Sequence, residues 1–163
     1  RDLPMKEVTL ETPQGIAKAH VISGRKLAFV PILRAGLGLI EGVTSLIPAA
    51  KIGHIGIFCD PGTHNAVKYY SKMPDDIAER EVIVVDAMLA TGTSANAAIQ
   101  DLKDMGVERI KFLCLLCSPE GKQALEEQHP DVDIYCGGMD EGLEDGYIIP
   151  GLGDAGDRIF GTK

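Results

Sequence analysis

Short apolar blocks alternate along this chain with segments whose apolar residues follow a helical period. The block 82–85 is wholly β-branched and apolar, which is typical of a strand buried on both faces of a parallel sheet. Beyond it, apolar residues recur at helical spacing up to Met105, and Gly106 can supply a left-handed stop. The same alternation predicts strands at 27–33, 54–58, 82–85, 110–116 and 133–136, and helices at 37–46, 94–105 and 119–128.

Helices placed between apolar strands imply right-handed crossovers and a mainly parallel sheet. The sequence therefore predicts a single α/β domain over residues 1–163, with helices flanking the sheet. Two segments have another character. Residues 59–70 contain proline, glycine and asparagine before the strand-like VKYY, which favours a projecting hairpin or a mobile flap. Residues 7–22 alternate enough to form a short hairpin beside the core.

Composition narrows the class of protein without identifying a reaction. The chain is 45% hydrophobic, which is enough to fill a core, and it holds no apolar stretch of membrane-spanning length. Its formal net charge of −8 argues against nucleic acid as a partner. No secretory signal is recognisable, so we expect a cytoplasmic protein that does not bind membranes.

The cysteines do not suggest a disulfide scaffold or a zinc site. Cys114 and Cys117 form a C-x-x-C motif inside the strand-like run 109–117. Residues three apart in a strand point to opposite faces, so this pair is not arranged to chelate one metal ion. No second pair completes a zinc set, and we expect buried, apolar cysteines.

A first candidate binding site lies where the block 82–85 is followed by a small, hydroxyl-rich turn. Asp86 stands where the predicted strand ends, and a helix would start near Ser94. Helix N-termini carry backbone N–H groups without intrahelical partners and attract anions, so a phosphate suits this turn. The hydroxyl groups of Thr91, Thr93 and Ser94 add donors, and Gly92 permits close approach. The alternative is an ordinary strand-to-helix turn in which these hydroxyls only cap the helix.

A second candidate follows the predicted strand 27–33. Arg34 would lie at the same edge of the sheet as Asp86, and Ala35 and Gly36 leave room for a ligand beside it. A guanidinium group binds phosphate oxygens through two parallel hydrogen bonds. The alternative is that Arg34 pairs with a nearby carboxylate.

A third candidate is the glycine-rich segment 151–156, which fits the dinucleotide fingerprint G-x-G-x-x-G. That fingerprint needs a following helix and a strand-helix-strand unit, whereas only seven residues follow Gly156. We therefore interpret the segment as a pocket in which backbone groups pair with a planar base.

Three segments together resemble one family. The run EVIVVDAMLATGTS at 81–94 is similar to the phosphoribosyl-diphosphate (PRPP) loop of type I phosphoribosyltransferases. The runs VPILRAGLG at 30–38 and GYIIPGLGDAGDRIFGTK at 146–163 closely resemble uracil phosphoribosyltransferases. The resemblance implies the α/β fold of that family, with a flap hairpin and a C-terminal base-binding loop. It also implies transfer of a phosphoribosyl group from PRPP to uracil, giving uridine monophosphate (UMP) and diphosphate.

By this resemblance, Asp86 and Arg34 carry the catalysis, and Mg²⁺ arrives with PRPP rather than in a protein metal site. The residues implied to bind PRPP are Arg34, Asp86, Ala87, Met88, Leu89, Ala90, Thr91, Gly92, Thr93, Ser94 and Asp154. Those implied to bind uracil are Tyr147, Ile148, Gly153, Asp154 and Ala155. The family also implies a non-proline cis peptide after the first sheet strand and assembly as a homodimer or higher homo-oligomer. Some members respond to GTP.

The chain departs from the family pattern at three places. Ala87 and Thr93 replace a proline and a glycine of the PRPP loop, and both changes look tolerable. Cys59 stands where the family commonly carries a second arginine for PRPP, for which Lys68 or Lys72 could compensate. The sequence starts at Arg1, without the N-terminal arm that the family places before R-D-L-P.

These departures leave other functions open. One alternative is a catalytically weak or non-enzymatic nucleotide-binding or regulatory homologue on the same fold. Another is a phosphoribosyltransferase for a different base.

Overall fold

The central feature of the computed structural model is a seven-stranded, mainly parallel sheet. The structure describes residues 5–22, 27–60, 62–63 and 65–162. Arg1 and Lys163, the first and last residues of the given sequence, lie outside these ranges. The strands are β1 (Met5–Thr12), β2 (Gly15–Ile22), β3 (Leu27–Leu33), β4 (Lys51–Ile52), β5 (His54–Cys59), β6 (Ala66–Lys72), β7 (Glu81–Leu89), β8 (Arg109–Cys117), β9 (Asp133–Met139), β10 (Gly142–Glu144) and β11 (Tyr147–Ile149). The helices are α1 (Leu37–Leu46), η1 (Ile77–Glu79), α2 (Thr93–Asp104), α3 (Pro119–Gln128) and α4 (Ala155–Phe160).

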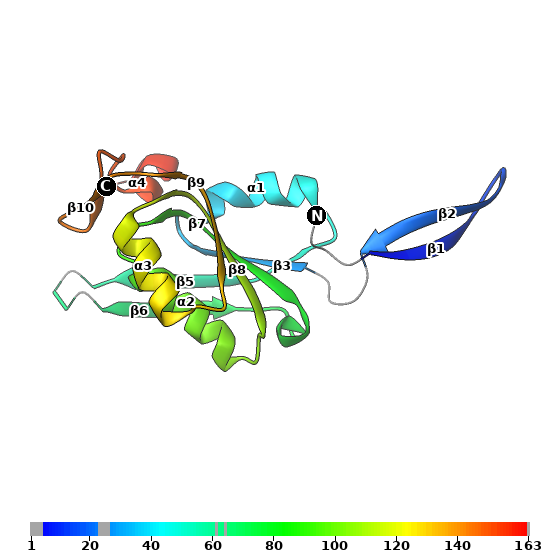
Figure 1. Cartoon of the computed structure of the whole chain (residues 1–163), viewed down its shortest axis with the longest axis horizontal. Helices are drawn as coiled ribbons and strands as arrows, with labels where there is room; N and C mark the ends of the chain where they lie inside the picture. Colours follow the sequence, from blue (N-terminus) through cyan, green and yellow to red (C-terminus); the bar gives the residue numbers. More distant parts are fainter. Residues whose placement is uncertain (1–4, 23–26, 61, 64, 163) are drawn as a thin grey trace.

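The sheet has the order β6-β5-β3-β7-β8-β9, with β4 paired to β3. All its pairings are parallel except that of β5 with β6. Helices α1 and α4 lie on one side of the sheet, and α2 and α3 lie on the other (Figure 1). The predicted α/β class, with a mainly parallel sheet flanked by helices, is confirmed.

The core forms where β3 and β7 lie side by side in the middle of the sheet. Val30, Val82 and Val84 are fully buried there, and Ile99 and Leu102 of α2 are fully buried in the same cluster. Burial on both faces explains why these strands are continuously apolar rather than alternating. Each such side chain contributes about 1.5–3 kcal/mol to folding.

Most of the predicted elements are confirmed within one to three residues, but the PRPP-loop strand is longer than predicted. We expected the strand to end at Asp86, whereas β7 continues to Leu89. The reason is that β8 also extends to Cys117, so Asp86, Met88 and Leu89 still have neighbouring backbone to pair with. The turn itself therefore begins at Ala90.

Both predicted hairpins are present. Strands β5 and β6 pair antiparallel, as expected for the flap, although Pro61 and His64 near its tip lie outside the described residues. Strands β1 and β2 also pair antiparallel. This hairpin does not lie beside the core as predicted, because it projects from the body of the molecule (Figure 1) and almost all its residues are exposed.

The cysteines of the C-x-x-C motif are buried, as predicted, but not on opposite faces of a regular strand. Pairing between β7 and β8 is interrupted between Cys114 and Leu116, and Leu115 is exposed. Cys114 and Cys117 consequently belong to one buried cluster. Burial raises the pKa of Cys114 to about 12 and that of Cys117 to about 11. Among the described residues, no three histidine, cysteine or acidic side chains are placed to hold a metal ion.

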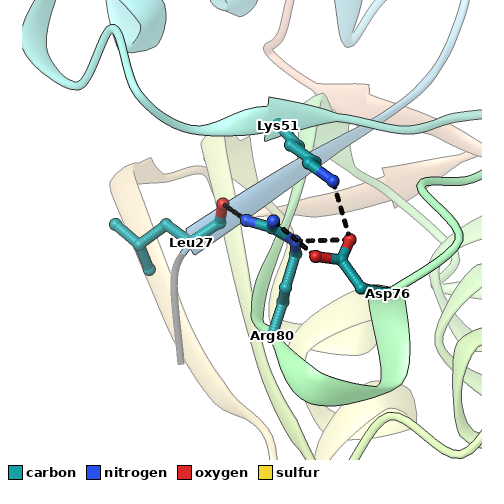
Figure 2. A network of polar contacts seen from close by, with 4 residues as sticks. All are labelled: Leu27, Lys51, Asp76 and Arg80. Atoms are coloured by element: carbon teal, nitrogen blue, oxygen red, sulfur yellow. Dashed lines mark hydrogen bonds and ion pairs between the residues drawn. The ribbon is translucent and has the colours of Figure 1, made fainter. Parts of the chain in front are cut away.

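A polar network closes the amino end of the sheet (Figure 2). Arg80 is only 5% exposed, and its Nε and Nη2 groups donate to the two carboxylate oxygens of Asp76 at 2.9 and 2.7 Å. Its Nη1 group donates to the Leu27 carbonyl at 3.2 Å, and Lys51 donates to Asp76 at 3.0 Å. The network joins the starts of β3, β4 and β7. Hydrogen bonds from Arg80 and Lys51 hold the pKa of Asp76 well below its usual range.

We predict that Arg80→Lys destabilises the fold, because lysine cannot donate to both Asp76 oxygens and to the Leu27 carbonyl at once. The free energy of unfolding should fall by about 1–2 kcal/mol, since Asp76 is partly exposed and water screens the pair. Urea denaturation measures this change. The same substitution at the exposed Arg109 is the control and should cost less than about 0.5 kcal/mol. Equal effects at the two positions would contradict the network's role.

Candidate active site

Two adjoining cavities lie at the carboxyl ends of β3 and β7. The smaller, of about 100 Å³, is lined by the end of β7 and the start of α2. The larger, of about 200 Å³, lies between the end of β7 and the C-terminal segment. Asp86, Met88 and Ala90 line both. In open α/β sheets this edge is where ligands bind.

The smaller cavity has the form of an anion cradle. Its lining residues are Asp86, Met88, Leu89, Ala90, Thr91, Gly92, Thr93, Ser94 and Ala95. Ala87, also predicted here, is buried and does not line the cavity; its N–H donates to Asp86 at 2.7 Å. Eight of the predicted PRPP residues therefore surround one space at a helix N-terminus, where N–H groups attract anions.

The local backbone explains why the Thr93 substitution fits. The left-handed conformation falls on Gly92, at φ 81°, and Thr93 is the first residue of α2. A β-branched residue is therefore not forced into positive φ. The Thr91 hydroxyl lies 2.9 Å from that of Thr93 and accepts from the Thr93 N–H at 3.3 Å.

The wall shared by the two cavities carries Asp86, whose carboxyl group has an unusually high pKa. Burial raises the pKa of Asp86 to about 7, the Ala87 N–H opposes the shift, and the charge of Asp154 adds to it. Asp86 therefore titrates near neutral pH, between a neutral hydrogen-bond donor and an anion.

The larger cavity is built from the C-terminal segment. All five residues predicted for the base site line it, namely Tyr147, Ile148, Gly153, Asp154 and Ala155, together with Ala35, Gly146 and Gly156. The segment is not a plain loop, because β10 and β11 form a hairpin and α4 follows. Asp154 caps α4 by accepting from the Asp157 N–H at 2.8 Å. The short helix begins inside the G-x-G-x-x-G match and continues beyond it, so helical structure does follow there, but no strand-helix-strand unit surrounds it in the described part of the chain.

Arg34 follows a cis peptide bond between Leu33 and Arg34, as the resemblance implied. Its Nη2 group donates to Asp157 at 2.8 Å, and its Nη1 group donates to the Thr162 hydroxyl at 2.8 Å. The pairing with a carboxylate that we considered as an alternative is therefore present, although the side chain remains about half exposed. Hydrogen bonding to Asp157 raises the pKa of Arg34, so it stays cationic.

Sequence reasoning missed the residues that bring these segments close together. A Cβ on Gly36 would lie 2.4 Å from the Val85 carbonyl oxygen, and one on Gly121 would lie 2.2 Å from that of Ala90. Ser118 caps α3 as its sequence indicates, but its hydroxyl also donates to the Ala90 carbonyl at 2.6 Å. The small residues of R-A-G and the Ser-Pro helix start were the available signals. Nothing local indicated the contacts of Asp157 and Thr162 with Arg34.

The flap carries Cys59 at the exposed end of β5, opposite Ala66. Lys68, considered as a replacement for the missing arginine, forms an ion pair with Asp101 of α2. Lys72 lies at the other end of the hairpin, opposite His54. Neither lysine lines the two cavities.

The sheet order, the cradle at the start of α2 and the arginine after β3 define the class as a type I phosphoribosyltransferase. A purine phosphoribosyltransferase from Pyrococcus horikoshii shares the fold, with a TM-score of 0.59 at 19% identity over 71% of this chain and 72% of that one. A protein structure from Aquifex aeolicus is much more similar, with a TM-score of 0.92 at 36% identity over 98% and 77% of the two chains.

Residues 1–162 match the family described as uracil phosphoribosyltransferase. Proteins of that name from Lysinibacillus sphaericus and Dictyoglomus turgidum are 60% and 61% identical, over all of this chain and 78% and 79% of their own lengths. The chain belongs to the uracil phosphoribosyltransferase family.

We predict that Asp86 makes stability depend on pH in the opposite sense to an ordinary paired carboxylate. The folded state keeps this proton up to about pH 7, whereas an unfolded chain releases it near about pH 4. The folded state thus binds more protons in that window, and its stability falls as pH rises through it. Asp86→Asn should flatten this fall in urea denaturation between about pH 4 and about pH 8.

The exposed Asp133 offers the matched control, because Asp133→Asn should leave the pH dependence as it is in the parent chain. The raised pKa of Asp86 would be contradicted if the stability of the parent chain rose across this pH range and Asp86→Asn showed the same pH dependence.

Proposed function

We propose that this protein transfers the phosphoribosyl group of PRPP to uracil, giving UMP and diphosphate in pyrimidine salvage. The observation that carries the proposal is the shared wall of the two cavities. A cradle for a ribose phosphate and a backbone-lined pocket for a base meet at Asp86. The two substrates of such a transfer must meet in this way.

The three predicted segments then have separate roles. The start of α2, with Thr91, Thr93 and Ser94, holds the ribose phosphate through N–H and hydroxyl groups. Arg34 holds the diphosphate by its charged donors. The loop around Gly153 and Asp154 pairs with the uracil edge through backbone groups, which rejects bases with the opposite pattern.

The reaction needs no covalent intermediate on the protein. Positive charge develops on the ribose as diphosphate leaves, so positioning and electrostatic stabilisation of the leaving group carry the catalysis. Above its pKa, Asp86 is an anion beside the cradle and can accept hydrogen bonds from the ribose hydroxyls.

The lining residues also fit Mg²⁺ that is brought by PRPP. Asp86 and Asp154 place two carboxyl groups on one cavity, and the charge of Asp154 raises the pKa of Asp86. Carboxylates are ligands that Mg²⁺ prefers, and this ion usually keeps waters and leans on substrate phosphates. When bound, it would neutralise charge on the diphosphate. Asp86 would hold one of its waters.

Two further parts of the proposal concern the protein's setting. A homodimer or higher homo-oligomer is supported by apolar side chains on the projecting β1–β2 hairpin, such as Leu10 and Ile16, which are 48% and 79% exposed. A cytoplasmic location agrees with the free thiols of all four cysteines. No helix in the described ranges is long and apolar enough to cross a membrane.

Diphosphate release from PRPP, Mg²⁺ and uracil tests the function directly, with hypoxanthine and orotate as competing bases. Of these three bases, we expect only uracil to be turned over. No turnover by folded protein at millimolar PRPP would refute the proposal, and UMP binding without turnover would support the non-enzymatic alternative.

We predict that Cys59→Arg tightens PRPP binding. The substitution restores a charge that the family commonly places on the flap, and one charged hydrogen bond contributes about 1.5–3 kcal/mol. The dissociation constant for PRPP, measured by calorimetry, should fall about ten- to a hundredfold. Cys59→Gln has a long polar side chain without charge, so it separates charge from size and should change the constant little. Unchanged affinity in Cys59→Arg would show that position 59 does not reach PRPP.

A further inference from the structure

Arg34 needs support that its own strand does not provide. It is the first residue after β3, and about half of its side chain is exposed. A long exposed side chain populates several rotamers, and fixing it costs conformational entropy. A guanidinium group that must meet diphosphate in one geometry therefore benefits from partners that hold it beforehand.

The C-terminal segment provides those partners as a closed set of three hydrogen bonds. Arg34 donates to Asp157 and to the Thr162 hydroxyl, each at 2.8 Å. The Thr162 hydroxyl in turn donates to the same Asp157 oxygen at 2.6 Å. The hydroxyl and the guanidinium group both lower the pKa of Asp157, so it remains an anion. Each member of the set is thus fixed by the other two.

Backbone structure holds the two partners in place. Asp157 lies in the first turn of α4, where its N–H is capped by Asp154. The chain then turns back at Gly161, at φ 65°, and the Thr162 N–H donates to the Asp157 carbonyl at 3.1 Å. The set leaves three of the five guanidinium N–H groups of Arg34 for a ligand.

We propose that Asp157 and Thr162 are positioning residues that hold Arg34 for the diphosphate of PRPP. This inference rests on the proposed function. The opposite effect would be competition between the Asp157 carboxylate and an anionic ligand for Arg34. Positioning prevails, since the set occupies only two donors and leaves the remaining face of the guanidinium group free to bind.

The test compares Thr162→Val, which removes the hydroxyl but keeps the shape, with Thr162→Ser, which keeps the hydroxyl. Thr162→Val and Asp157→Ala should raise KM for PRPP about three- to tenfold, the effect of losing one modest hydrogen bond. Thr162→Ser should match the parent chain. The dissociation constant of inorganic diphosphate, measured by calorimetry, should rise in the same variants.

The KM for uracil separates positioning from damage to the fold. Asp154 and Ala155, at the start of the same helix, line the base cavity, so a disturbed α4 would raise KM for uracil as well. We expect KM for uracil to change less than about twofold. Glu127→Ala on α3, which removes an exposed acid bonded to Gln123, is the control for charge and should leave both constants unchanged.

Three outcomes would overturn the inference: unchanged KM for PRPP, a lowered KM for PRPP, which would show competition, or equal rises for both substrates. A parent chain that does not turn over uracil and PRPP would instead refute the proposed function. The diphosphate titration then still reports whether Asp157 and Thr162 tune Arg34.

Discussion

The parallel pairing of β3 with β7 is the constraint on which the rest of the structure depends. Residues 27–31 of β3 pair in register with residues 81–85 of β7, and both strands are buried by helices on each face. Because this register places Asp86 beside the end of β3, Arg34 and Asp86 lie at the same edge of the sheet. The pairing is tight at that edge, since a side chain on Gly36 would lie 2.4 Å from the Val85 carbonyl oxygen. The Arg80 network secures the same two strands at their other ends.

Packing of α3 against the end of β7 extends this constraint to the cradle. The Ser118 N–H and hydroxyl donate to the carbonyls of Leu89 and Ala90, and Gly121 allows the helix to approach Ala90. The turn before α2 is therefore held from behind by backbone and hydroxyl groups. Such a cradle is formed before any ligand arrives, so little ordering cost remains to be met on binding.

The fold and most of the candidate site could be predicted because their signals are local. Continuous apolar runs fix the buried strands, and Gly92 with the hydroxyls around it marks the cradle. The prediction failed where a neighbouring strand decides the outcome, as at Asp86, Met88 and Leu89, which pair with β8. It also failed for Asp157 and Thr162, which contact Arg34 across more than a hundred residues of chain. No spacing in the sequence encodes a contact of that kind, and only the folded topology brings it about.

The charge balance of the site explains why its substrate should bring a cation. Within the described part of the chain, the cavity linings contain the carboxyl groups of Asp86 and Asp154 but no lysine or arginine. Arg34, the nearby cation, is already paired with Asp157. A bare diphosphate entering beside Asp86 would meet like charge in a partly desolvated space, where Coulomb energies are large. Protonation of Asp86, whose pKa is about 7, relieves part of this repulsion but removes an acceptor for the ribose. Under the proposed function, a divalent cation carried by PRPP would relieve it and would leave Asp86 ionised, so the acidic wall suits a magnesium-bound substrate better than a free one.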